Sequence, residues 1–129
     1  MIKELIISIF IIILIFVGDA VTQNYTKESV EEVSIGLKEL REELIENDIK
    51  FEKVKDAIDK IHDNWDNKYE KLAYYIEHDE LEKVHTSIVK MKSYVENENF
   101  SEAMAELEEG KFVIEHIQEK NSFNLQNIF

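Results

Sequence analysis

The chain has 129 residues, which suffices for one membrane-spanning segment and one domain of about a hundred residues. Its formal net charge is −13, and a surface this acidic repels phosphate backbones, so we expect no nucleic-acid partner. There is no proline, there are three glycines, and 33% of the residues are charged, a composition typical of long helices. The absence of cysteine excludes a disulfide framework, a thiol nucleophile and a thiolate metal site.

Residues 5–18, LIISIFIIILIFVG, form an apolar run that only Ser8 interrupts. A membrane span needs about 20 mostly apolar residues, and residues 1–21 would extend about 30 Å as a helix. The charged residues of this segment lie near its ends, where their side chains reach the membrane interface: Lys3, Glu4 and Asp19. We therefore predict a transmembrane anchor over residues 1–21.

Two alternatives for this segment stay open, a cleaved signal peptide and a buried helix of a soluble domain. Gly18 and Ala20 are the small residues that a signal peptidase reads, and cleavage would leave a secreted domain that begins at Val21. The single Lys3, cancelled by Glu4, is a poor basic region, which favours the anchor. Because acidic residues dominate after the stem, we expect the domain to lie outside the cytoplasm.

The next segment, residues 22–28, is either a juxtamembrane linker or a continuation of the stem helix, because no proline or glycine breaks it. An acidic helical domain is expected over residues 29–129. Its apolar residues recur at alternating spacings of three and four, which predicts four amphipathic helices. Their stripes are Val30, Val33, Leu37, Leu40 and Leu44; Phe51, Val54, Ile58, Ile61, Trp65, Tyr69, Leu72 and Ile76; Leu81, Val84, Ile88, Met91 and Val95; Ala103, Leu107, Ile114 and Ile117.

The fold class that these stripes predict is all-α, with short loops that make successive helices antiparallel neighbours. Asp48 is expected to cap the second of these helices, and Asp79, with Glu82 three residues on, to cap the third. After the transmembrane helix we expect an antiparallel four-helix bundle or two stacked helical hairpins. A faint repeat, in which residues 51–58 resemble 100–107, keeps the second arrangement open.

Histidines and carboxylates near the ends of the helices are the candidates for metal binding. An up-down bundle would bring residues 77–79 close to residues 115–116, and imidazole and carboxylate suit several divalent metals. The ligands would be His78, Asp79, Glu82 and His116. Capping of helix ends explains the same residues without a metal. We therefore expect no metal and no cofactor, with metal binding as the alternative.

The remaining candidates are aromatic side chains and possible catalytic groups. Trp65, Tyr69, Tyr74 and Tyr75 could stack on sugars, but aromatics at helical spacing are more often packed inside a bundle. The sequence contains neither a nucleophile elbow nor a glycine-rich phosphate loop. We expect that the protein is not an enzyme.

The last residues carry four large apolar side chains, Phe123, Leu125, Ile128 and Phe129. One interpretation is that this tail folds back and covers the apolar surface of the last helix around residues 112–114. The other is that these four residues dock onto a partner in the membrane.

Several short motifs follow the hydrophobic N-terminal segment in a fixed order: Trp65, then Ile76-Glu77-His78-Asp79-Glu80-Leu81, Tyr94-Val95-Glu96, Glu102-Ala103 with Leu107, Glu115-His116-Ile117 and Leu125-Gln126-Asn127-Ile128. Their order and spacing resemble the bacterial domain of unknown function family 4363, small proteins found mainly in Firmicutes. The resemblance implies a membrane-anchored helical domain with no established activity.

Together these patterns predict a single-pass protein of the cell membrane with an extracytoplasmic helical domain. The function we expect is that of an interaction accessory of another membrane or envelope protein. The alternatives are a ligand- or divalent-metal-binding bundle, or a secreted form after cleavage of the signal.

Overall fold

The computed structural model describes the backbone of residues 1–128 and the side chains of residues 1–122. This part of the chain folds into four helices and contains no strand, which confirms the predicted all-α class. The helices are α1 (Ile2–Leu44), α2 (Phe51–Leu72), α3 (His78–Glu96) and α4 (Phe100–Ile128).

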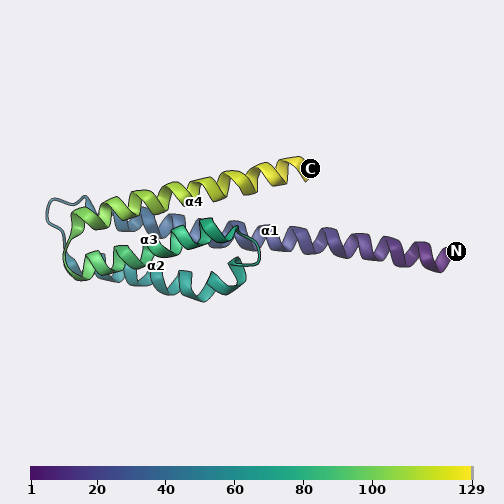
Figure 1. Ribbon diagram of the computed structural model, residues 1–129, viewed down its shortest axis with the longest axis horizontal. Helices are drawn as coiled ribbons and strands as arrows, with labels where there is room; N and C mark the ends of the chain where they lie inside the picture. Colours follow the sequence, from purple (N-terminus) through teal and green to yellow (C-terminus); the bar gives the residue numbers. More distant parts are fainter. Residues whose placement is uncertain (129) are drawn as a thin grey trace.

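The longest helix, α1, contains 43 residues and extends about 65 Å. Its N-terminal half projects alone beyond the other helices (Figure 1). This half is long and apolar enough to cross a membrane, and none of its most apolar window is buried within the protein. The helix passes through residues 22–28 without a break, so this segment is a helical connection rather than a separate linker.

The other half of α1 packs into the bundle from Thr26 onward. The Thr26 side chain is buried, and its hydroxyl donates to the Thr22 carbonyl at 3.0 Å. This bond satisfies a buried polar group at the point where packing begins. The stem and the first bundle helix are therefore one continuous element.

The helices form a ring in which α1 contacts α2 and α4, and α3 contacts the same two neighbours. Successive helices run in opposite directions (Figure 1). Of the two predicted arrangements, this is the antiparallel four-helix bundle, because the α1–α4 contact closes the ring.

The core consists of the predicted stripes, since helical periodicity places these residues on the inward face of each helix. The buried hydrophobic side chains are Val30, Val33, Leu37, Leu40, Leu44, Val54, Ile58, Ile61, Trp65, Leu72, Ile76, Leu81, Val84, Ile88, Met91, Val95, Ala103, Leu107, Val113, Ile114 and Ile117.

Both predicted helix caps are wrong. Helix α2 begins at Phe51 with Lys50 as its N-cap, and α3 begins at His78 with Glu77 as its N-cap. Neither cap residue makes a side-chain capping bond. Ile49 and Phe51 pack against the core, which keeps residues 49–50 outside the helix and places Asp48 in the turn. Asp79 lies inside the first turn of α3, where its negative charge interacts favourably with the positive end of the helix dipole.

The backbone of α4 stays helical as far as Ile128 and reaches past the turn between α2 and α3 (Figure 1). The expectation that this segment folds back over the last helix is therefore wrong. The side chains of Phe123, Leu125 and Ile128, together with Phe129, lie outside the described residues, so their predicted docking role stays a prediction.

A close approach between α1 and α2 occurs at Gly36. A Cβ added there would lie 2.9 Å from Ile61 Cγ1, closer than real side-chain contacts. The glycine therefore lets the two helices pack at their observed separation.

We predict that Gly36→Ala destabilises the bundle. Overpacking costs about 1–3 kcal/mol, which exceeds the gain of up to about 1 kcal/mol from better helix propensity. Denaturant titration of the full chain in detergent micelles should show the loss. In an Ile61→Ala background the same substitution should cost nothing, and an equal cost in both backgrounds would contradict the close contact as its cause.

Candidate functional site

The start of α3 and the C-terminal half of α4 are joined by a cluster centred on Glu80. His116 Nδ1 lies 2.7 Å from Glu80 Oε1, and Lys120 Nζ lies 3.1 Å from the same oxygen. The Glu80 side chain is only 12% exposed. Lys120 also pairs with Glu77 at 3.3 Å. The hydrogen bond to Glu80, followed by that to Glu77, raises the pKa of Lys120.

The four predicted metal candidates do not converge. His78 Nε2 lies 3.5 Å from Glu82 Oε1 on the exposed face of α3, and Asp79 is also exposed. His116 pairs with Glu80 instead. Within the part of the chain whose side chains are described, no group of three or more His, Cys, Asp or Glu residues is placed to hold a metal ion. Both histidines contact carboxylates, so neither serves as the helix cap that was the alternative to metal binding.

The sequence correctly predicted that the start of α3 lies beside residue 116. It did not predict that Glu80 is the central group of the cluster. Adjacent positions on a helix differ by about 100°, so the rotation of α3 decides which of residues 77–80 faces α4. The buried Leu81 and Val84 set that rotation. In the sequence, the position of Glu80 directly before the apolar residue Leu81 indicates that residue 80 flanks the core.

Ion pairs cross each of the four helix interfaces. Such contacts add little stability when exposed, but they favour one register of neighbouring helices. They are Glu32–Lys68 between α1 and α2, Asp59–Lys92 between α2 and α3 at 3.8 Å, Lys90–Glu106 between α3 and α4 at 3.8 Å, and Arg41–Glu108 between α1 and α4 at 2.9 Å. Arg41, the single arginine of the chain, therefore has a structural partner.

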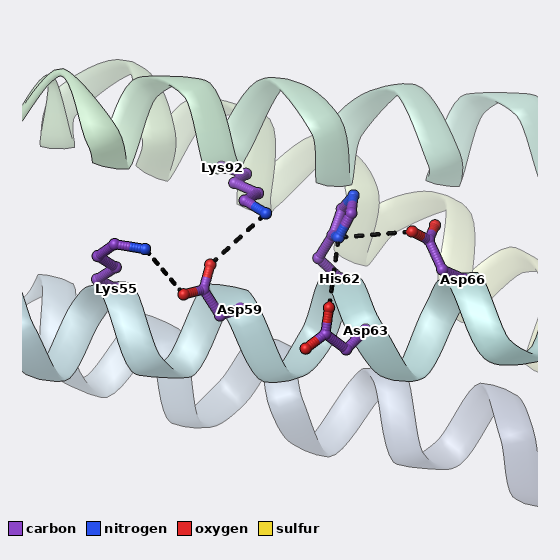
Figure 2. Close-up of polar contacts among 6 residues, drawn as sticks. All are labelled: Lys55, Asp59, His62, Asp63, Asp66 and Lys92. Atoms are coloured by element: carbon purple, nitrogen blue, oxygen red, sulfur yellow. Dashed lines mark hydrogen bonds and ion pairs between the residues drawn. The ribbon is translucent and has the colours of Figure 1, made fainter.

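Figure 2 shows the polar contacts along the α2–α3 interface, where Lys92 reaches from α3 towards Asp59 of α2. Asp59 also accepts a hydrogen bond from Lys55 at 2.9 Å, which raises the pKa of the Lys55 ammonium. Further along α2, His62 Nδ1 lies 3.6 Å from Asp66 Oδ2 (Figure 2). The Asp59–Lys92 pair links the two helices, whereas the Lys55–Asp59 and His62–Asp66 pairs lie within α2.

The predicted packing role of the aromatic residues holds for Trp65 and Tyr69. Trp65 is fully buried, and its indole nitrogen donates to His85 Nδ1 at 3.3 Å. The Tyr69 ring meets Trp65 edge-on and lies 5.0 Å from the His85 ring. Tyr74 and Tyr75, in contrast, are exposed in the turn between α2 and α3.

A groove of about 360 Å³ lies between α1 and the C-terminal half of α4. It combines apolar groups, charged groups of both signs and neutral polar groups, which suits an elongated ligand or a protein segment. The residues that line it are Lys27, Glu31, Ser34, Ile35, Lys38, Gln118, Asn121 and Ser122. The amide nitrogen of Asn121 is buried and has no hydrogen-bond partner within residues 1–122.

The fold and these contacts define a class of protein, an acidic helical bundle continuous with a stem that is long and apolar enough to cross a membrane. A family model for a domain of unknown function, DUF4363, matches residues 20–128. The chain therefore belongs to this family, which confirms the resemblance in the sequence motifs. The matched segment covers the whole bundle and leaves out nearly all of the stem. Comparisons with curated proteins and with solved structures find no match.

The contact of Glu32 between α1 and α2 makes the stability of the fold depend on pH, and the direction of this dependence follows from the pKa of Glu32. Hydrogen bonds from Lys68 and then from Asn64 lower the pKa of the Glu32 carboxyl below its ordinary value of 4.5. A carboxyl with a lowered pKa stabilises the fold above its ordinary pKa. That stabilisation disappears as the pH falls through the lowered value.

We predict that Glu32→Gln removes part of the acid-induced loss of stability. Because Glu32 is 52% exposed, the effect on the free energy of unfolding is about 0.5 kcal/mol. Denaturant titrations between about pH 6 and pH 3 measure it. The matched Glu31→Gln variant, altered one residue away on α1, should keep the wild-type acid response. Identical responses in Glu32→Gln and the wild type would contradict the pairing.

Proposed function

We propose that this protein is a single-pass membrane protein whose acidic bundle lies outside the cytoplasm and binds another membrane or envelope protein. The observation that carries the proposal is the division of α1. Its apolar N-terminal half buries nothing within the protein, whereas its other half supplies one side of the bundle core. A lipid bilayer is the environment that would cover the exposed apolar half.

The continuity of α1 supports a positioning role for the stem. A helix that continues from the membrane into the bundle holds the bundle at a fixed height and direction, which a flexible linker would not do. The proposed side of the membrane rests on Lys3, the basic residue that precedes the stem.

The groove between α1 and α4 supports an interaction role. An amphipathic segment of a partner would lie along it with apolar side chains against Ile35. Lys27 and Lys38 would attract acidic groups of that segment, although the chain as a whole is strongly acidic. The predicted docking residues Phe123, Leu125, Ile128 and Phe129 come after Ser122 in the chain, and Ser122 is the last groove residue among the side chains that the structure describes.

Site-specific photo-cross-linking in intact cells tests both parts of the proposal. The probe replaces Ile35 in the groove, and in the matched control it replaces Val89 on α3; the two side chains are 50% and 44% exposed. We expect the chain to stay with membranes through a high-salt wash. The probe at position 35 should capture one discrete protein that the probe at position 89 does not capture, and Ser34→Arg should reduce this capture.

Two results would contradict the proposal in different ways. Release of the chain by the salt wash, with a mature N-terminus at Val21, would make it a secreted domain. Retention with equal capture from both positions, or with capture from neither, would leave the anchor and reject the groove as a docking surface.

A further inference from the structure

Three tyrosines gather at the end of the bundle nearest the stem, and we name Tyr25, Tyr74 and Tyr75 the tyrosine collar. The Tyr25 and Tyr75 rings meet edge-on with centroids 6.4 Å apart, and the Tyr74 and Tyr75 centroids are also 6.4 Å apart. Lys71 Nζ lies 5.5 Å from the centre of the Tyr25 ring. The collar therefore joins α1 to the α2–α3 turn.

The collar lies at the height expected for the headgroup region of a bilayer. Tyr25 is one helical turn after Val21, about 6 Å further along α1. The headgroup region occupies about 5–7 Å beyond the hydrocarbon on each side. Side chains on a helix also lean towards its N-terminus, which for Tyr25 is the direction of the stem. Contact with the Tyr25 ring brings Tyr75 close to the same level.

Packing within the protein explains only part of the collar. Tyr74 is 84% exposed, so its ring does not serve the core of the bundle. Tyrosine is enriched at membrane interfaces because its ring enters the acyl boundary while its hydroxyl stays hydrated. Lys71 beside the collar suits a phosphate headgroup.

The segment of α1 around the collar carries no charge. Residues 20–26 of α1 contain no charged side chain, in contrast to the acidic bundle. The carboxylates of Glu77 and Glu80, which follow the collar in the chain, are paired with Lys120. The collar therefore adjoins an uncharged segment of α1, and one lysine partly neutralises the two carboxylates that follow it.

We propose that the tyrosine collar inserts into the headgroup region of the membrane that holds the stem, so that the bundle stands end-on against the bilayer. The proposal rests on the membrane anchor proposed above and adds a second lipid contact to it. Because aromatic insertion carries the contact, it does not require anionic lipids.

Quenching by brominated lipid tests the collar. The full chain with Tyr74→Trp is reconstituted in phosphatidylcholine vesicles with bromine near the top of the acyl chains. Emission of the unaltered chain, in which Trp65 is buried, supplies the background. The control is Phe112→Trp, an aromatic exchange at a position on α4 that is 72% exposed. Antiparallel pairing of α1 and α4 places this residue about 18 Å further from the membrane than Tyr25.

We expect the brominated lipid to remove much of the emission added by Tyr74→Trp and to leave that of Phe112→Trp unchanged. Vesicle flotation, measured on the same samples, separates the two proposals. Flotation without quenching of Tyr74→Trp would overturn the collar and keep the anchor. Equal quenching of both variants would show a bundle that lies flat, which also overturns the end-on contact. A chain that does not float would reject the anchor itself.

Discussion

The burial of one face of α1 fixes the direction in which the stem leaves the bundle, and the rest of the architecture depends on it. Val30, Val33, Leu37 and Leu40 are all buried, and each fully buried aliphatic side chain contributes about 1.5–3 kcal/mol. Because α1 continues without interruption to Ile2, rotating or tilting the stem relative to the bundle would pull these side chains out of the core. The position of the bundle is thus coupled to that of the stem through packing.

Polar contacts then select one arrangement among those that the apolar core permits. Each interface of the ring carries an ion pair, and Glu80 draws His116 and Lys120 together at the start of α3. The Glu80 contact accounts structurally for His116, whose chemistry first suggested metal binding. Among the described residues, the groove beside Ile35 and the exposed tyrosines near the stem are two surfaces that these contacts do not occupy.

The parts that the sequence predicted well are those that local periodicity determines. The stripe of α1 from Val30 to Leu44 and the stripes of the other helices form the core, because their spacing places them on one face whatever they pack against. The predicted cap at Asp48 was wrong because packing of Ile49 and Phe51, rather than a capping bond, decides where α2 begins. The predicted cap at Asp79 was wrong because α3 begins one residue earlier, at His78. The pairing of Glu80 with His116 was not predicted because it depends on how α3 is rotated about its own axis. The sequence left open whether the helix continues through residues 22–28, because these residues are weak helix formers. They become helical when tertiary packing buries Thr26 and Ser29.

The distance between Val17 and Ile35 tests the continuity of α1 most directly. The chain has no cysteine, so a spin label at each position can be introduced without other changes. The two residues are five helical turns apart on one face of α1, on opposite sides of residues 22–28, and both are exposed. For a continuous helix, pulsed electron resonance on the reconstituted chain should give one narrow distance distribution centred at about 27 Å. A broad distribution, or one centred at a clearly shorter distance, would show a joint between stem and bundle and would contradict this account.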